Sequence, residues 1–350
     1  MATPFPKSTF IKKFEWTGER LSYPEADVKG DTYPTTWADD DEIYTSAGDP
    51  LWGETKDGLD FEKFSGGPTD YKITKLNPMN DYTGWGGNGP KPTGMICVDG
   101  VLYLAFQNLR RMQQPPHSLI SQHGSDAQII CAKRNNSGWG VGAWAPALGN
   151  ITTPMFPGHK FGGPAFINFG KNNANARDEF VYAVSSDQWD NGSNLRLGRV
   201  PADSIMRHEA WQWVCTFTPA GEPAWHHNLD EAIPVLSLHR WLGIPEMVYL
   251  AGIKRYLLFT WRLHKDFSGD DGTDLLVLES PEPWGPFALV HTEEYWEGQA
   301  FNPYCPRVPL KWMAADGQSG WLQFSGSWSK SGQAAGYYRS HVRPFRLTMA

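Results

Sequence analysis

Three acidic residues of the sequence stand beside stretches that are typical of strands, and together they could support acid–base chemistry: Asp31, Asp49 and Glu246. Glu246 adjoins the apolar run of IPEMVYL, where a charge without a role would be costly. Two carboxyl groups in different environments can divide the roles of acid and base, because burial raises one pKa and a nearby cation lowers the other. We interpret the three residues as candidate catalytic groups for cleavage of a glycosidic bond.

Each of these residues also has a structural interpretation that stays open. Glu246 could form a salt bridge to a lysine or arginine near it, and Asp31 could be a loop acid close to Lys29. Asp49 could cap the turn between a glycine and a proline. The three consecutive aspartates at 39–41 differ from these, because such a run before an apolar stretch is typical of a solvated turn.

The composition indicates an all-β protein with many turns. The 350 residues include 17 tryptophans, 36 glycines and 27 prolines. Proline and glycine at this level interrupt long helices, and aromatic residues favour pleated sheets. The net charge of -7 lacks the basic excess that binding to phosphate groups demands, so we expect neither nucleic acid nor a membrane as a partner.

Two further features concern the compartment. The start of the sequence, MATPFPKSTFIKKF, lacks the apolar segment of a secretory signal. We therefore expect a cytoplasmic protein, or a secreted or periplasmic one without its signal. The four cysteines lie far apart without a CxxC pair, which favours reduced core residues over a metal or disulfide framework. They are Cys97, Cys131, Cys215 and Cys305.

A repeat along the chain defines the expected fold. Five strand-like segments each carry an aromatic residue or a leucine at the centre, and these centres lie 59 to 79 residues apart. The central residues are Tyr44, Tyr103, Tyr182, Tyr256 and Leu322. Periodic β-units of this length predict an all-β, five-bladed β-propeller with four-stranded antiparallel blades. A β-sandwich is the alternative, but it does not explain five copies of one strand pair. We expect a single domain, 1–350, with blades near 31–90, 91–150, 160–220, 243–295 and 301–348.

A propeller would gather distant side chains at one end of its axis. The first strand of a blade begins at the same face where the second strand ends, because a hairpin joins the two at the opposite face. This rule places Asp31 and Asp49 together. The candidate substrate-binding residues that it collects are Lys91, Asn108, His159, Asp187, Arg262, Tyr304, Arg307 and Trp328. Such a mixture of charges and aromatic rings suits a polyhydroxylated ligand, so we expect an oligo- or polysaccharide as partner.

Other chemistries find less support in the sequence. The glycine-rich stretches GGPAF and GWGGNG lack the spacing and the lysine of a phosphate-binding loop, and no GxSxG motif is present. His226 and His227 in PAWHHNLDE could bind a metal, but no acid stands at a standard offset, and a surface loop is the favoured interpretation. We expect no cofactor, with a calcium ion on the propeller axis left open.

Several motifs resemble those of a known group. The stretches that carry the likeness are TWADDDEIYTSAGD, FGGPAFINFGK, DEFVYAVS, LRLGRVPADSIM, IKRYLLFTW and ESPEPWGPFALV. They are similar to the bacterial and fungal proteins grouped as domain of unknown function 4185, a relative of five-bladed arabinanase- and fructosidase-type glycosidases that includes endo-D-arabinanases. The resemblance implies a propeller glycoside hydrolase in which Asp31, Asp49 and Glu246 are the axial carboxylates. Trp52 and Trp85 fall in a long loop at 50–90 that would shape the substrate site.

Three functional hypotheses follow. The favoured one is a glycoside hydrolase, with an arabinan-like furanoside as one substrate class. The second is a polysaccharide lyase on the same scaffold, with His159 or His123 and Tyr304 as base and acid. The third is a carbohydrate-binding propeller without catalysis, because fold alone does not determine activity.

Overall fold

The computed structural model describes residues 4–25, 28–52, 55–56, 58–79, 87–111, 122–133, 144–146, 150–264, 272–299, 301–327 and 335–350. Side chains at 51, 52, 55, 56, 87, 88, 110, 111, 122, 123 and 125 are not part of this description. Within these residues the protein is all-β, and no helix is long and apolar enough to cross a membrane. Its sheets confirm the expected five-bladed β-propeller.

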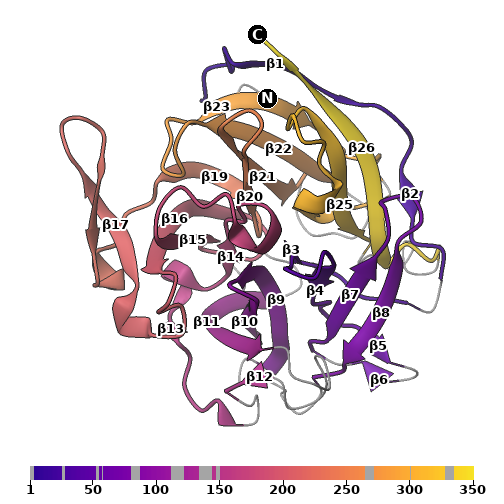
Figure 1. Cartoon of the computed structure of the whole chain (residues 1–350), viewed down its shortest axis with the longest axis horizontal. Helices are drawn as coiled ribbons and strands as arrows, with labels where there is room; N and C mark the ends of the chain where they lie inside the picture. Colours follow the sequence, from indigo (N-terminus) through magenta and orange to yellow (C-terminus); the bar gives the residue numbers. More distant parts are fainter. Residues whose placement is uncertain are drawn as a thin grey trace.

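Five antiparallel sheets surround a common axis (Figure 1). The first blade is built from β3 (Thr35–Trp37), β4 (Ile43–Thr45), β7 (Phe61–Ser65) and β8 (Lys72–Asn77). A short hairpin, β5 (Leu51–Trp52) and β6 (Thr55–Lys56), extends from it. The second blade is built from β9 (Gly87–Val98), β10 (Val101–Arg111), β11 (Gln122–Lys133) and β12 (Trp144–Ala145), with β13 (Phe156–Pro157) paired to β11.

The third and fourth blades follow in the same order. The third consists of β14 (Pro164–Phe166), β15 (Phe180–Ser186), β16 (Gly192–Pro201), β17 (Gln212–Phe217) and β18 (Pro223–His226), with β19 (Leu236–Leu242) paired to β16. The fourth consists of β20 (Glu246–Leu250), β21 (Arg255–Leu263), β22 (Thr273–Ser280) and β23 (Ala288–Glu293). Short 3₁₀ turns connect strands: η2 (His159–Phe161), η3 (Lys171–Asn173), η4 (His208–Ala210), η5 (Leu229–Glu231) and η6 (Leu310–Trp312).

The fifth blade closes the ring with strands from both ends of the chain. It consists of β24 (Tyr304–Arg307), β25 (Ser319–Gly326), β26 (Arg339–Met349) and β1 (Ile11–Trp16), with β2 (Leu21–Ser22) also paired to β26. Strand β1 pairs antiparallel with β26, from Ile11 opposite Met349 to Trp16 opposite Phe345. The outermost strand of this blade therefore comes from the N-terminal segment, which the expected range 301–348 did not include.

The first strands of the blades line the axis, where they touch one another. Strand β9 contacts β3 on one side and β14 on the other, and β20 contacts both β14 and β24. A hydrogen bond from the Tyr249 amide to the Asn168 carbonyl joins the third and fourth blades near the axis. These first strands are therefore close in space although they are far apart in the sequence.

The two ends of the first hairpin separate as the sequence predicted. The aspartates at 39–41 are exposed in the turn between β3 and β4. Asp41 forms ion pairs with Lys171 and Lys311 at this end of the molecule. Asp31 is bridged to Gly48 at the other end of the hairpin. The interpretation of the triplet as a turn is confirmed.

Large aromatic side chains fill the spaces between blades. Trp211, directly before β17, and Trp213 on β17 are fully buried, and both rings lie edge-on to Phe156 from the second blade. The four cysteines are free, and two of them, Cys97 and Cys305, are buried. Because neighbouring blades cover both faces of each sheet, even residues on the polar side of a strand can be buried.

Phe14 packs between the fourth and fifth blades, and a substitution there tests its contribution to ring closure. The ring of Phe14 on β1 is 5% exposed and stacks on Phe345 of the same blade and on His291 of the fourth blade. We expect Phe14→Ala to lower the free energy of unfolding in urea by about 3–5 kcal/mol, because the truncation leaves a cavity between the two blades. Lys12→Ala, on an exposed position of the same strand, is the control and should change it by less than about 0.5 kcal/mol. Equal effects of the two substitutions would show that β1 contributes little to closure.

Candidate active site

Asp31 lies at the axial end of the first blade in a buried, hydrogen-bonded position. Its side chain is 9% exposed. Its Oδ2 accepts hydrogen bonds from the hydroxyls of Tyr304 and Tyr338, each at 2.9 Å. Burial and the nearby charge of Asp49 raise the pKa of Asp31 to about 6, although Lys91 and the two tyrosines counteract part of this shift. This carboxyl can therefore hold a proton at mildly acidic pH.

The backbone at Gly48 allows Asp31 and Asp49 to approach each other. Gly48 exchanges two backbone hydrogen bonds with Asp31, at 2.9 and 2.8 Å. A Cβ atom at Gly48 would lie 2.4 Å from Asp31 Oδ1, so a side chain there would displace the carboxyl group. Asp49, the next residue, has a left-handed backbone with φ of 47°. The glycine before Asp49 is thus part of the site.

Asp49 forms an ion pair with a lysine of the second blade. Lys91 Nζ lies 2.5 Å from Asp49 Oδ1, and the two side chains are 8% and 25% exposed, respectively. Lys91 stands on β9, the innermost strand of its blade. Asp49 is thus the more accessible of the two aspartates, and it is held opposite a cation.

Glu246 lies at the start of the fourth blade and is bound by Arg307 of the fifth. Arg307 is fully buried, and its Nη1 lies 3.2 Å from Glu246 Oε2. Burial raises the pKa of Glu246 to about 7, and Arg307 limits the shift. Arg307 also donates to the carbonyls of Thr32 and Pro245. Through Thr32, which follows Asp31, this ion pair connects with the aspartate site.

Six of the residues that the axial rule selected therefore lie together, in two connected groups. One group contains Asp31, Asp49, Lys91 and Tyr304, and the other contains Glu246 and Arg307. We call them the aspartate cluster and the Glu246–Arg307 pair. They come from blades one, two, four and five. For Glu246, the structural interpretation as a salt bridge is the arrangement observed.

Other predicted residues are held by partners of their own. Asn108 donates to Asp126 at 2.6 Å, and Asp187 accepts two backbone amides and the Asn194 side chain within its own hairpin. Arg262 pairs with the buried Asp274 and covers the ring of Trp241. His159 is exposed in η2. Trp85 and Trp328, and the side chain of Trp52, lie outside the described residues.

The sequence argument missed Tyr338, the second tyrosine on Asp31. It precedes β26, the third strand of its blade, whereas the axial rule considered only the starts of first strands and the ends of second strands. The signal that could have found it is the pair of tyrosines in GYYRS directly before a long strand. Tyrosine hydroxyls on a carboxylate favour its charged form, so Tyr338 is part of the electrostatics of the site.

Two buried carboxyl groups in the first blade were also missed. Asp60 and Glu62 are both 0% exposed, and Asp60 Oδ1 accepts the amide of Ala47, close to the aspartate cluster. Burial and the charge of Asp60 raise the pKa of Glu62 well above its ordinary value. The alternation in DFEKF places both acids on one face of the chain. In a sheet with only one buried face, that acidic face would be expected in solvent.

Comparisons with known proteins identify the fold. No protein-family model matches the sequence, and no curated protein matches it, so the resemblance to domain of unknown function 4185 is not confirmed. A presumed hydrolase from Bacteroides ovatus has a similar structure, with a TM-score of 0.56, 12% identity and coverage of 93% of this chain and 87% of that one. The α-L-arabinofuranosidase of Podospora anserina, in complex with cellotriose, gives a TM-score of 0.51 at 10% identity, with 97% of each chain covered. A GH43_1 enzyme from Xanthomonas citri, complexed with xylotriose, gives 0.50 at 14% identity, with 94% and 92% covered. At these identities, what the chain shares with them is the fold.

The buried Glu62 predicts a particular dependence of stability on pH. Between its ordinary pKa of 4.5 and its raised pKa, the folded state keeps a proton that the unfolded state has lost, so stability falls as the pH rises. Lys75 opposite it on β8 moderates this loss, and Asp60 strengthens it. We expect Glu62→Gln to reduce this loss of stability. In urea unfolding, the free energy of unfolding of the variant relative to that of the wild type should therefore rise from pH 4.5 to neutrality.

The control for this experiment is Glu222→Gln, which changes an exposed glutamate in the third blade. Its stability relative to the wild type should stay within about 0.5 kcal/mol at every pH. A difference between Glu62→Gln and wild type that is constant with pH would contradict the raised pKa of Glu62.

Proposed function

We propose that this protein is a glycoside hydrolase that cleaves a glycosidic bond in an oligo- or polysaccharide. One observation carries the proposal: Asp31 and Asp49 adjoin each other at the axial end of a five-bladed propeller, in contrasting environments. One is buried with a raised pKa, and the other is paired with Lys91. Glycoside hydrolysis requires such a division between a carboxylic acid and a carboxylate.

In this mechanism Asp31 is the general acid. Its Oδ2 is occupied by two tyrosine hydroxyls, which leaves Oδ1 as the oxygen that carries the proton. Gly48 has no side chain, so Oδ1 of Asp31 packs directly against its backbone without being displaced. With a pKa of about 6, the group can hold a proton at mildly acidic pH and give it to the leaving oxygen of the substrate.

Asp49 is the carboxylate that activates water or attacks the anomeric carbon. It is more exposed than Asp31, and Lys91 holds its Oδ1 by an ion pair. An adjacent cation stabilises the charged form of a carboxylate, which is the form that either role needs. Glu246 acts as a positioning residue, because Arg307 links its carboxylate to the backbone beside Asp31.

The structural neighbours support a carbohydrate substrate. The Podospora anserina protein is named as an α-L-arabinofuranosidase, and the Xanthomonas citri enzyme was complexed with xylotriose. The motifs similar to domain of unknown function 4185 favour an arabinan-like furanoside within this class. The lyase hypothesis gains no specific support, because the Tyr304 hydroxyl that it requires as acid donates to Asp31.

An activity screen with matched variants tests the proposal. The wild type is incubated with arabinans, fructans, uronate-containing polymers and bacterial wall glycans, and the products are separated and identified. We expect reducing-end release from at least one neutral polymer. Asp31→Asn and Asp49→Asn should each lower kcat/KM on that substrate about 100-fold to 10,000-fold, because each removes an acid–base group.

The control is Asp203→Asn, at an exposed aspartate of the third blade, which should keep wild-type activity. Circular dichroism and thermal unfolding show whether each variant is folded. Full activity of folded Asp49→Asn would remove Asp49 from the mechanism. An unsaturated product would identify a lyase, and tight binding without turnover would identify a binding protein.

The pH profile tests the role of Asp31 through Tyr338. The hydrogen bond from Tyr338 lowers the pKa of Asp31, so its removal should raise that pKa further. If Asp31 must be protonated, kcat/KM declines as the pH rises through about 6, and Tyr338→Phe should move this decline to higher pH. Tyr337→Phe, at the neighbouring position, is the control and should leave the profile unchanged. A shift to lower pH in Tyr338→Phe would contradict the assignment of Asp31 as the acid.

A further inference from the structure

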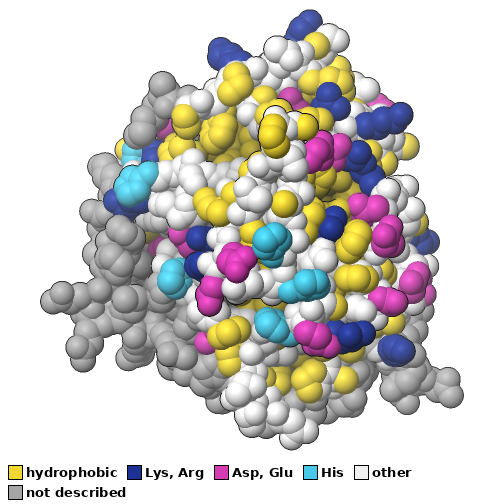
Figure 2. Space-filling view, turned by 90° about the vertical axis from the view of Figure 1, so that its left-hand side faces the viewer, with side chains coloured by type: hydrophobic (Ala, Val, Ile, Leu, Met, Phe, Trp, Pro, Cys, Tyr) yellow, Lys and Arg dark blue, Asp and Glu magenta, His cyan; other side chains and the backbone are white. Residues whose placement is uncertain are grey.

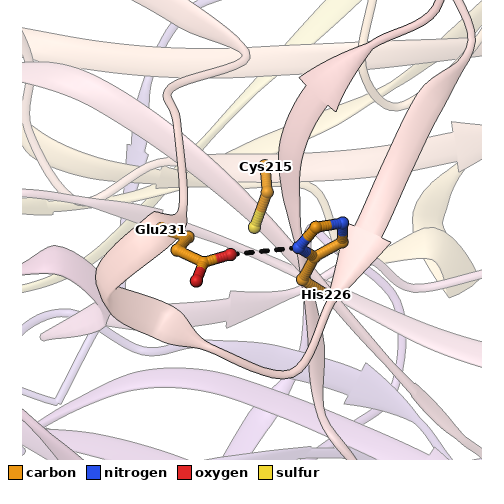
Figure 3. Close-up of side chains that lie close together, drawn as sticks. All are labelled: Cys215, His226 and Glu231. Atoms are coloured by element: carbon orange, nitrogen blue, oxygen red, sulfur yellow. Dashed lines mark hydrogen bonds and ion pairs between the residues drawn. The ribbon is translucent and has the colours of Figure 1, made fainter.

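A second group of reactive side chains lies on the third blade, apart from the axial residues. Cys215, His226 and Glu231 each offer one atom, and these atoms all lie within 4.8 Å of one another (Figure 3). His226 Nδ1 is 3.0 Å from Glu231 Oε2. The β17–β18 hairpin that carries two of them projects from the body of the propeller (Figure 1). From that side, histidine and acidic side chains gather on one face (Figure 2).

From this geometry we propose that Cys215, His226 and Glu231 bind a zinc ion. A thiolate, an imidazole nitrogen and a carboxylate oxygen are the three ligand types that zinc takes in proteins. With zinc–ligand bonds of about 2.0–2.3 Å, neighbouring ligand atoms of a tetrahedral site lie roughly 3.3–3.7 Å apart. The present separations, up to 4.8 Å, approach these values, so binding needs the longest of them to shorten by roughly 1–1.5 Å.

The backbone places the sulfur atom where the site requires it. Strands β17 and β18 pair regularly from Trp213 to Val214, and the register then shifts between Val214 and Thr216. Cys215 is the extra residue of this β-bulge. A bulge turns a side chain away from the direction that regular alternation would give it. The sulfur of Cys215 thereby lies beside the 3₁₀ turn η5, as Figure 3 shows.

Asn228 orients the carboxylate of Glu231 by a hydrogen bond, as neighbours of metal ligands do. Its Nδ2 donates to Glu231 Oε1 at 3.0 Å, which leaves Oε2 toward His226. Its Oδ1 accepts the amide of Asp230 and so begins the turn that presents Glu231. A hydrogen bond from the Ile233 amide to the Val214 carbonyl then fixes the end of this turn to β17. The ligands thus come from three segments joined by hydrogen bonds, which favours a preformed site.

The surroundings indicate the kind of site. The side chains of His226 and Glu231 are 51% and 54% exposed, so a fourth ligand position would open to solvent and accept water. Binding would release the thiol proton of Cys215 and hold His226 in its neutral form. The ion would fasten the projecting hairpin to η5, and this role is independent of the glycosidase proposal. His227 differs, because its Nδ1 contacts the Trp211 carbonyl.

Metal titration of the full chain tests the proposal. The protein is treated with a chelator under reducing conditions, freed of the chelator, and titrated with Zn²⁺ by calorimetry and with Co²⁺ by absorption spectroscopy. We expect one ion per chain, with a dissociation constant on the order of 1 µM or below. The cobalt form should show a thiolate charge-transfer band in the near ultraviolet and tetrahedral bands in the visible range.

Variants separate this site from adventitious binding. Cys215→Ser should abolish the charge-transfer band, and His226→Gln should weaken zinc binding on the order of 100-fold. Asn228→Ala should weaken it roughly 10-fold while the band remains. His227→Gln and Cys131→Ser are the matched controls and should bind as the wild type does. The proposal is overturned if the wild type binds no stoichiometric zinc, if the band persists in Cys215→Ser, or if His227→Gln and His226→Gln lose affinity equally.

Discussion

The axial end of the molecule depends on the hydrogen bonds and the ion pair that the guanidinium group of Arg307 forms. This group is fully buried, and it reaches the carbonyl that follows Asp31 in the first blade and both a carbonyl and a carboxylate of the fourth blade. A buried cation without such partners would be strongly destabilising, so these contacts require blades one, four and five to meet in one arrangement. The same arrangement brings Tyr304 to Asp31 and sets the environment of the aspartate cluster.

Burial of both faces of each blade explains the raised pKa values of three carboxyl groups. In an exposed sheet, Asp31, Glu62 and Glu246 would meet water on one side and keep ordinary pKa values. Here neighbouring blades remove that water, and burial is the first cause of the raised pKa in all three. Desolvation of the charged form both lowers the stability of the fold and lets these carboxyl groups hold a proton at a pH where an exposed carboxyl group is ionised.

The sequence was sufficient to predict the blades and part of the site, because both follow from local patterns and topology. The five repeat centres fall on the second strands of the sheets, and the axial rule joined Asp31 to Asp49 and Lys91. The rule did not predict the partners of Asn108, Asp187 and Arg262, since it locates a residue along a strand but does not say which neighbouring group binds its side chain. It also had no means to place β1, whose pairing with β26 joins residues at opposite ends of the sequence.

The pairing of β1 with β26 has a consequence for how the chain is ordered. Because residues from the two ends lie side by side in one sheet, the order of blades along the polypeptide is circular in space (Figure 1). A connecting segment between Ala350 and the residues before β1 would leave the strand pairs intact, and a new start could be opened between any two blades. The fold is thus compatible with circular permutation, because a chain with the blades in a permuted order could form the same strand pairs.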